Sequence, residues 1–420
     1  MTLAPLSRSA GLRRLLPDPG PGRPLALSTL VNTLGNGLLM PTMALFLTRS
    51  VGLSAVQVGV GLSIAGAAGL LAGLPAGYLA DRVGPRGLLV TLNVLAGVTT
   101  SALALVHTFP TFLLVATVDA VFDSGGSAVR AGLVAGVLPA AGRVRTQAYL
   151  RSVTNLGIAM GAAGAGIGLH YDTRAAYVTL ILLDAVTFVV AGLGLLGVPR
   201  VAPHPRPPEG PRMPVLRDRS YLAVTALNSV LAIHYGLLEI GVPLWIAERT
   251  SAPHWSVAAV FGVNTVMCVL FQVRVSRGTE DVTRAATLSR RGGLLLAASC
   301  GLFAAAAARS AAVALVVLGL AALVQVLGEM SQASGSWGVA FGLAPDAMQG
   351  QYQGIFSSGF AVSRMLAPLV VTTLAVSWGV AGWLVLAALF AAAGTALVPV
   401  TRWAASAGPR AGRPPAPDAA

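Results

Sequence analysis

The sequence contains no lysine, only two cysteines and few charged residues of any kind. Charged residues occupy 10% of the 420 positions, whereas soluble domains carry roughly 25% to cover their surfaces. With 55% hydrophobic residues and a mean hydropathy of +0.76, the chain falls outside the water-soluble class, and lipid is its expected solvent. Cys268 and Cys300 both lie in apolar stretches, so we expect no disulfide framework, no metal site and no cofactor.

A net charge of +13 raises the question of nucleic-acid binding. All 28 basic residues are arginine, and they occur in alternate loops between apolar runs, which is the pattern of membrane insertion and not of a nucleic-acid surface. With a cytoplasmic N-terminus, 22 arginines are cytoplasmic and four are on the opposite face. The positive-inside rule therefore predicts a multi-pass protein of the inner (cytoplasmic) membrane with both termini in the cytoplasm and no nucleic-acid partner.

Twelve apolar runs are each long enough to form a membrane helix. They are continuously apolar and do not alternate, which favours helices over strands. The runs cover residues 25–47, 55–80, 87–107, 110–137, 150–169, 174–197, 221–247, 254–275, 291–308, 311–342, 351–377 and 379–401. The sequence therefore predicts an all-α membrane protein of twelve transmembrane helices.

One long linker, residues 198–220, is rich in proline and arginine and divides these spans six and six. It separates an N-terminal half, 25–197, from a C-terminal half, 221–403, and the two halves show a weak internal repeat. Residues 1–24 are predicted to be a cytoplasmic segment. Residues 404–420, rich in Ala, Pro and Gly, are predicted to be a disordered cytoplasmic tail.

Five carboxylates fall inside the predicted spans, where each costs about 2.5 to 3.5 kcal/mol on insertion scales. They are Asp119, Asp123, Asp184, Glu239 and Glu329. Most of them belong to polar stripes that recur at helical spacing in spans 1, 4, 7 and 10. The stripes are Ser28, Asn32 and Asn36; Asp119, Asp123, Ser127 and Arg130; Asn228, Tyr235 and Glu239; and Gln325, Glu329, Gln332 and Ser336. Such residues must face a partner or a water-filled space.

A buried carboxyl group loses hydration and binds a proton more readily, so these acids are candidates for proton coupling. The candidates are Asp119, Asp123 and Glu239, followed by Glu329. The alternative is an internal ion pair, of Asp123 with Arg130 or of Glu329 with Arg364. A structural role is predicted for Asp184 in span 6.

Other polar residues within the spans are candidates for lining a substrate cavity. They are Asn32, Asn36, Asn228, His234, Tyr235, Gln325, Arg130 and Arg364. His234 could relay protons, although a hydrogen-bonded packing histidine is the favoured interpretation.

The segment GYLADRVGPRG, which lies between two spans, resembles the cytoplasmic loop signature of the major facilitator superfamily of transporters. The matching positions are Gly77, Asp81, Arg82, Gly84 and Arg86, with Pro85 at a position that is more often basic. The resemblance implies two six-helix, pseudo-symmetric halves with spans 1, 4, 7 and 10 around a central cavity. It also implies that Asp81 faces the start of span 11, near Gln351 and Tyr352, and that Arg82 and Arg86 help to latch the halves.

Span 5 carries Gly157, Gly161 and Gly164, which allow close helix packing. This segment resembles a weakened form of the fifth-span motif of drug and proton antiporters, with Ala162 in place of the usual proline. The Gly328-Glu329 pair and the segment 343–354 are similar to those of bacterial multidrug exporters of the same superfamily. The resemblance thus implies a multidrug efflux antiporter.

We therefore expect a secondary active transporter that exports a small, partly apolar drug or metabolite in exchange for protons, by alternating access. The alternatives are a proton symporter or uniporter for nutrient uptake and, from another class, a non-transporting membrane sensor. The sequence has no GxxxxGK[ST] loop, no HExxH motif and no plausible hydrolase triad, so no enzymatic activity is expected. The expected partners are a small-molecule substrate, protons and the lipid bilayer, with the protein as a monomer.

Overall fold

The computed structural model describes residues 20–40, 42–203, 213–307 and 309–407, which form helices and no strands. The first half contains α2 (Gly22–Leu39), α3 (Met43–Leu45), η1 (Phe46–Ser50), α4 (Ala55–Val83), α5 (Pro85–Ala102), η2 (Leu103–Leu105), α6 (Phe109–Val137), α7 (Ala140–Tyr171), α8 (Arg174–Gly194) and η3 (Leu195–Gly197). The second half contains η4 (Pro214–Arg217), α9 (Arg219–Ala232), α10 (His234–Gly236), η5 (Leu237–Gly241), α11 (Val242–Arg249), α12 (Trp255–Val275), α13 (Val282–Ala305), α14 (Ala311–Leu343), η6 (Asp346–Met348), α15 (Gln349–Val371), η7 (Thr372–Ser377) and α16 (Val380–Ala407).

Ten helical segments of the described chain are long and apolar enough to cross a membrane. The two other predicted spans correspond to α7 and α13, which begin at Ala140 and Val282 instead of the predicted 150 and 291. Their first turns carry arginines, and a hydropathy run marks only the apolar part of a helix that continues into the polar layer. With α7 and α13 included, the predicted all-α fold of twelve helices in two halves is confirmed.

The predicted ends and linker fall partly outside the described residues, at 1–19, 204–212 and 408–420. In the described part, α16 continues to Ala407, a few residues past the predicted start of the tail. The predicted domain boundaries therefore remain predictions.

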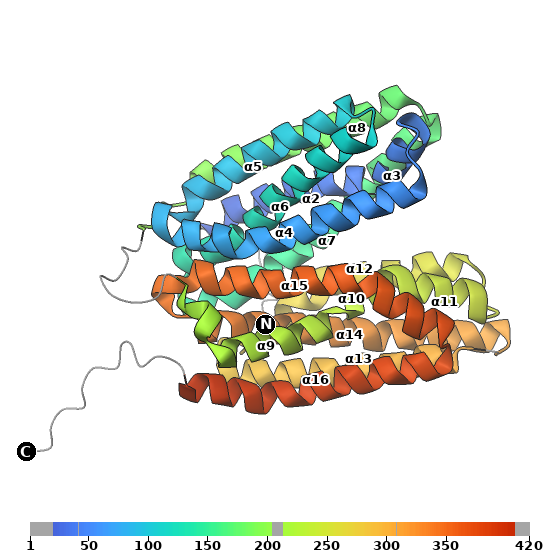
Figure 1. The fold of residues 1–420 in the computed structure, drawn as a ribbon. Coiled ribbons are helices and arrows are strands. Elements are labelled where there is room, and N and C mark those ends of the chain that lie inside the picture. The colour runs from blue at the N-terminus through green and yellow to red at the C-terminus, as the bar shows by residue number, and fades with distance from the viewer. Residues whose placement is uncertain (1–19, 41, 204–212, 308, 408–420) are drawn as a thin grey trace, which may run out of the picture.

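The two halves are separate bundles, blue to green above and yellow to red below in Figure 1. In the first half α2 packs against α7 and α8, and α6 packs against α4 and α5. In the second half α13 packs against α14 and α16. Between the halves α4 packs against α15, and α7 packs against α12. Spans 2, 5, 8 and 11 therefore form the interface between the halves.

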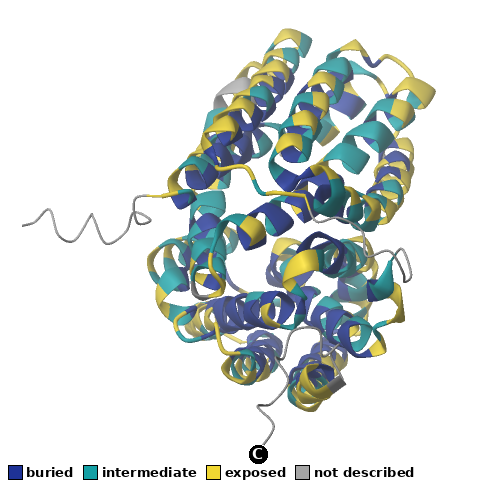
Figure 2. Cartoon of the chain, turned by 90° about the vertical axis from the view of Figure 1, so that its left-hand side faces the viewer, coloured by how far each residue is buried: buried dark blue, intermediate teal, exposed yellow. Residues whose placement is uncertain are grey.

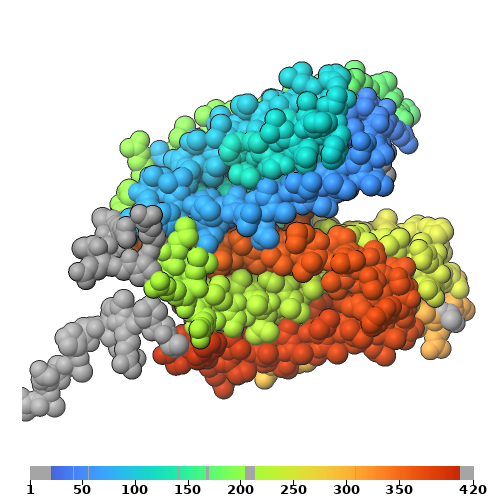
Figure 3. All heavy atoms as spheres, viewed as in Figure 1, coloured from blue at the N-terminus to red at the C-terminus, as the bar shows by residue number. Residues whose placement is uncertain are grey.

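The halves meet at the end that carries the linker and the last turn of α16, and they diverge toward the end that carries α3 and α11 (Figure 1). We call these the linker end and the distal end. Figure 3 shows the row of blue atoms of α4 directly against the orange atoms of α15. The interface is therefore closest toward the linker end.

The outer surface of the bundles is apolar. Large side chains such as Val56, Leu71, Val316 and Leu369 are each more than two thirds exposed. Figure 2 shows exposed residues on the outward faces of the helices and buried ones between them. A contiguous apolar exterior of this kind suits lipid and not water.

Span 7 is not one regular α-helix. It is built of α9, α10, the π-helical segment η5 and α11, and Glu239 lies in η5. Span 1 is also divided, into α2, α3 and the π-helical segment η1. Single π turns inside helices are found most often at functional sites. The corresponding first spans of both halves therefore share an irregular backbone.

Candidate functional site

Glycines allow the backbones of α4 and α15 to touch toward the linker end. A Cβ atom on Gly77 would lie 2.1 Å from the carbonyl oxygen of Gly350, and one on Gly350 would lie 2.3 Å from the carbonyl oxygen of Gly77. One turn away, a Cβ on Gly354 would lie 2.8 Å from the carbonyl oxygen of Gly73. Only glycine fits at such a close approach of two backbones. Gly77 of the loop signature thus permits direct contact between the halves.

Asp81 caps a helix of the opposite half. Its carboxylate accepts hydrogen bonds from the backbone N–H groups of Gly350, at 2.8 Å, and Gln351, at 3.0 Å. These groups lie in the first turn of α15, and Met348, the residue at the N-cap of that helix, makes no capping bond of its own. First-turn N–H groups lack partners within a helix, and the helix dipole favours an anion there. The contact expected for Asp81 is thus present in the structure.

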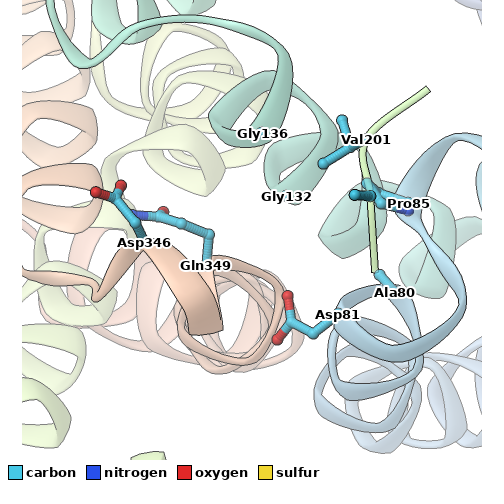
Figure 4. Close-up of a pocket in the computed structure, with 9 residues that line it drawn as sticks. Ala80, Asp81, Pro85, Gly132, Gly136, Val201, Asp346 and Gln349 are labelled. Atoms are coloured by element: carbon cyan, nitrogen blue, oxygen red, sulfur yellow. The ribbon is translucent and has the colours of Figure 1, made fainter. Parts of the chain in front are cut away.

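Figure 4 shows the surroundings of Asp81, whose side chain points toward the start of α15. A cavity of about 20 Å³ lies between Asp81, Gln349 and Val201, with room for about one water molecule. Gly84, which joins α4 to α5, has a φ of +93°, which an L-residue with a side chain rarely adopts. Pro85 is the first residue of α5, a position where its missing N–H costs nothing.

The two arginines of the loop signature contact their own half. Arg86 donates a hydrogen bond from Nη1 to the carbonyl oxygen of Val198 at 2.8 Å. The Arg82 guanidinium lies over the Tyr78 ring, 5.0 Å from its centroid. A latch formed by these two arginines remains a prediction.

Other side chains also connect the halves. Arg143, at the start of α7, forms an ion pair with Asp346 at 3.0 Å, and the Asp346 side chain is 84% exposed. Further inside, the Ser358 hydroxyl of α15 donates to the carbonyl oxygen of Leu70 of α4 at 3.2 Å. The contact between the halves therefore continues from the linker end toward the middle of the spans.

Three exposed charged side chains, Asp123, Glu239 and Arg364, lie in the middle of the spans, and we call them the central charged group. Asp123 is the fifteenth of the 29 residues of α6, about 21 Å from either end of that helix. Of the charged groups around Asp123, Arg364 of the other half interacts with it most strongly, and Arg364 is also the strongest charged neighbour of Glu239. All three are exposed, and no direct ion pair joins them in the described chain. These three side chains therefore lie near one another and come from both halves.

The predicted alternative of an ion pair between Asp123 and Arg130 is wrong for the described residues. Arg130 instead donates from Nη1 to the Thr29 hydroxyl of α2 at 3.3 Å. Its positive charge still interacts with Asp123, but less strongly than that of Arg364.

Asp119, one turn before Asp123, faces the interior of the first half. One of its carboxylate oxygens accepts from the hydroxyls of Thr99, at 2.8 Å, and Thr100, at 3.0 Å, both on α5. Asp184 of α8 is 1% exposed and interacts electrostatically with Asp119 and Asp123. Of the three acids within the predicted spans of this half, Asp184 is buried, Asp119 is partly buried and Asp123 is exposed.

Glu329 forms the buried ion pair between the halves. Arg151 of α7 donates from Nη2 to its Oε1 at 2.9 Å, and Asn264 of α12 donates to its Oε2 at 2.7 Å. The Arg151 guanidinium also lies 4.8 Å from the centroid of the Tyr235 ring. The predicted alternative, an ion pair of Glu329 with Arg364, is therefore wrong. Its partner is Arg151, which lies at the start of the predicted span 150–169.

The polar stripe of span 7 contacts that of span 10. The side-chain oxygen of Asn228 accepts from the Gln332 amide at 2.8 Å and from the Ser336 hydroxyl. His234 is fully buried, its ring centroid lies 4.0 Å from that of Tyr235, and the Gln332 side chain lies next to it. A hydrogen-bonded packing role for His234 stays a prediction.

Two further amide residues are buried without full hydrogen bonding. Both amide atoms of Gln325 and the amide nitrogen of Asn32 have no partner among the described residues. Asn36, one turn after Asn32, is partly buried. Unpartnered buried amides are costly, so these groups are candidates for contact with water or substrate.

The glycines of span 5 pack within the first half. A Cβ atom on Gly157 would lie 2.1 Å from the Thr33 hydroxyl, and one on Gly161 would lie 2.1 Å from the carbonyl oxygen of Leu34. Gly164 lies one turn further, against α2 as well. These glycines bring α7 and α2 together, which positions the polar stripe of span 1.

An apolar groove of about 440 Å³ runs between α9 and α15. Ser358, whose hydroxyl donates to Leu70 of the other half, lines the groove together with Leu366, so the groove reaches the interface between the halves.

The sequence model of the Major Facilitator Superfamily matches residues 25–368, which include most of both halves. The chain belongs to the Major Facilitator Superfamily. The resemblance inferred from the loop signature is thereby confirmed.

A curated relative is a Deinococcus radiodurans protein named as a sugar efflux transporter. It is 27% identical over 263 residues, which cover 60% of this chain and 65% of the relative. The match thus spans just under two thirds of the relative's length.

Solved structures of superfamily transporters share the fold at low identity. A bacterial homologue of the iron transporter ferroportin in an outward-facing state gives a TM-score of 0.72 at 14% identity, with 92% of this chain and 99% of that chain covered. A proton:xylose symporter gives 0.69 at 12% identity, with 89% and 94% covered. A human organic anion transporter gives 0.65 at 17% identity, with 90% and 98% covered.

Sequence reasoning missed Arg151 and Asn264 as partners of Glu329. Arg151 is the second residue of the predicted apolar run, so a position inside the span was visible in the sequence. Asn264 lies in the middle of span 8, one of the interface spans of the superfamily fold. A search for all polar residues inside spans, and not only for stripes, would have found both.

Proposed function

We propose that this chain exports a small molecule in exchange for protons by alternating access. The central charged group supports this best. It lies in the middle of the spans, between two halves whose contact is closest toward the linker end. Charged side chains at this depth are costly unless they serve an ion or substrate pathway.

The arginine distribution gives the orientation. The linker end carries most of the arginines and is therefore taken as cytoplasmic, so both termini are cytoplasmic in an inner membrane. In this orientation the structure corresponds to a state that is closed toward the cytoplasm, with Asp81 as the latch. Protons then reach Asp123 and Glu239 from the outside.

Asp123 and Glu239 are the preferred proton-coupling residues. Each is exposed and interacts with Arg364, so binding of a proton and binding of a substrate near the same arginine compete. Competition of this kind is what exchange requires. Asp119 is a weaker candidate because two threonine hydroxyls already bind its carboxylate.

The substrate class is proposed from two features. The relative named as a sugar efflux transporter favours a sugar. The unpartnered amides of Asn32 and Gln325 can bind hydroxyl groups, and Tyr235 with Phe360, whose rings are 5.4 Å apart, offers an aromatic surface. A partly apolar drug or metabolite remains the second candidate, because the same aromatic pair also suits an apolar ring.

The test uses inverted membrane vesicles that contain the protein and an imposed proton gradient. A pH-sensitive dye reports proton flux while labelled mono- and disaccharides and the lipophilic cation tetraphenylphosphonium are added. The expected result is accumulation of one of these compounds with dissipation of the gradient. Movement of the compound in the same direction as the protons would show symport and contradict proton-coupled export. Transport without proton flux would show uniport.

A further inference from the structure

The apolar groove between α9 and α15 lies on the outside of the second half. Most of its walls are apolar, formed by Leu222, Ala226, Val230 and Ile233 of α9 and by Ile355, Val362 and Leu366 of α15. On α15, Val362 and Leu366 each lie about 200° around the helix from Arg364, so they face away from the central charged group. In Figure 3 the green atoms of α9 and the orange atoms of α15 meet on the outer surface. The groove is therefore accessible from the surrounding lipid.

Four hydroxyl residues also line the groove, but their hydroxyl groups are not available to an occupant. Ser229 donates to the carbonyl oxygen of Thr225 at 2.8 Å, and Ser358 donates to that of Leu70 at 3.2 Å. The hydroxyl oxygens of Thr225 and Ser363 are buried below the surface. Ligand pockets of this size normally present a few accessible polar groups that orient the ligand. This groove instead suits a hydrocarbon chain, which needs no hydrogen bond.

The length of the groove matches one leaflet of a bilayer. Leu222 and Ile233, at its two ends on α9, are 11 residues apart, which is about 16 Å along the helix. The hydrocarbon core of a bilayer is roughly 30 Å thick, so one leaflet contributes about 15 Å. Leu222 lies in the first turn of α9, at the linker end. A lipid chain from the leaflet at the linker end would therefore run along the whole groove.

Two arginines lie at the linker end of the groove. Arg219, the first residue of α9, precedes Leu222 by one turn on the same side of the helix, and Arg217 lies in η4 directly before it. Both side chains are exposed. Asp218, between them, is engaged elsewhere, because its carboxylate accepts from the Tyr352 hydroxyl at 3.0 Å and from the first turn of α9. The opening of the groove thus presents positive charge, which attracts an acidic lipid head group.

We propose that this groove binds one acyl chain of an acidic phospholipid from the leaflet at the linker end, with the phosphate of the lipid beside Arg219 and Arg217. Burial of the chain against the apolar walls stabilises the complex, and the two arginines select the head group. The bound chain contacts α9 and α15 together, next to the bond between Ser358 and Leu70 that joins the halves. The site goes beyond the proposed function, because it depends neither on the transported compound nor on protons.

The direct test is photo-cross-linking of the full-length protein in phosphatidylcholine nanodiscs. The probe is phosphatidylglycerol with a diazirine in one acyl chain, added at a low mole fraction, and the labelled residues are mapped by mass spectrometry. We expect the labels to concentrate on the groove residues of α9 and α15, at roughly fivefold or more above the exposed faces of α12 and α16. A phosphatidylcholine probe with the same chain should label the groove roughly fivefold less than the phosphatidylglycerol probe.

Two variants test the chain and the head group separately. Ala226→Trp should fill the groove and remove its labelling, because Ala226 is an exposed residue of the α9 wall. Its control is Ala388→Trp, at an exposed alanine of α16, which should leave labelling of the groove unchanged. Arg219→Gln should lower the labelling by phosphatidylglycerol roughly fivefold. Its control is Arg402→Gln, at an exposed arginine near the linker end of α16. If Ala226→Trp fails to fold, thermal unfolding of the unmodified protein in detergent gives a second measurement, and phosphatidylglycerol should raise its midpoint more than phosphatidylcholine does.

Three results would overturn the lipid site. Labels spread evenly over the outer faces of the helices would show that the groove has no preference for a lipid chain. Equal labelling by the phosphatidylcholine probe would contradict recognition of an acidic head group. Displacement of the probe by tetraphenylphosphonium, and not by unlabelled phosphatidylglycerol, would assign the groove to a transported apolar compound. None of these measurements involves transport, so the lipid site and the proposed function can each fail without the other.

Discussion

The linker end and the middle of the same interface are built from opposite kinds of residue. Toward the linker end, glycines bring two backbones into contact, and one carboxylate caps a helix of the other half. In the middle, the central charged group is exposed and has no direct ion pair in the described chain. The first region allows close contact, and under the proposed function the second binds and releases protons. This difference is what alternating access needs, and the following variants test it in order of expected effect.

Gly77→Val should have the largest effect, because the new side chain cannot fit against the carbonyl oxygen of Gly350. We expect the linker end to stay open and transport to fall to background. The measurement is transport in vesicles at matched protein levels. The control is Gly66→Val on the same helix, where a Cβ meets no atom within 4 Å. Near-normal transport in Gly77→Val would contradict the role of the Gly77–Gly350 contact in closing the linker end.

Asp123→Asn and Glu239→Gln should separate coupling from transport. Each removes a titratable group beside Arg364, so proton-driven accumulation should fall at least tenfold while substrate exchange at equal pH continues. Counterflow of labelled substrate without a proton gradient measures the substrate exchange at equal pH. Glu248→Gln, an exposed acid at the end of α11 toward the distal end, is the control and should behave normally. Normal accumulation in both Asp123→Asn and Glu239→Gln would show that another acid couples transport to protons.

Asp81→Asn should have an intermediate effect. The charge at the start of α15 contributes about 0.3 to 2 kcal/mol, so the closed population should fall by roughly two- to thirtyfold. The transport rate and the distance between spin labels at Val83 and Thr283, which lie in different halves at the linker end, should change together. A changed distance with an unchanged rate would show that closure at this end does not limit the cycle.

Arg86→Gln should change transport by less than about twofold, because its hydrogen bond to Val198 lies within the first half and a typical hydrogen bond contributes about 1 kcal/mol. The measurement is the transport rate at matched protein levels. A loss as large as that of Asp81→Asn would show that Arg86 contacts the other half in another state of the cycle.

Asp172→Asn should have the smallest effect. The Tyr177 hydroxyl, followed by Arg49, lowers the pKa of the Asp172 carboxyl, so its stabilising contribution is present above about pH 4 and is lost as the pH falls below that value. Since Asp172 and Arg49 are both exposed, the contribution is small. Thermal unfolding at pH 7 should be unchanged within error, and a large destabilisation would assign this pair a structural role.

The fold could be predicted because lipid imposes strong rules on sequence. The twelve apolar runs were sufficient for the span count. The predicted starts of α7 and α13 differ from the structure only where these helices extend beyond the apolar layer. The contact of Asp81 with the start of α15 was expected from the loop signature, whereas the close backbone contact at Gly77 was not.

The pairing of the charges could not be predicted in the same way. Periodicity places Asp119 and Asp123 on one helix face, but it does not show that Asp119 turns toward α5 while Asp123 is exposed. Nor does it show that Glu329 finds Arg151, because that contact depends on how two halves pack. Helical spacing thus predicts which residues share a face, whereas partners across an interface require the tertiary structure.

The central claim is that the linker end must open in every transport cycle. The most direct test replaces Arg143 and Asp346, which pair across the halves at the linker end, by cysteines and joins them with a reducible bifunctional reagent; both native cysteines are buried. Arg49 and Asp172, an exposed ion pair within one half, receive the same treatment as the control. The account predicts that cross-linking Arg143→Cys to Asp346→Cys stops transport, that reduction restores it, and that the control pair transports throughout. Continued transport with the linker end cross-linked would contradict the account.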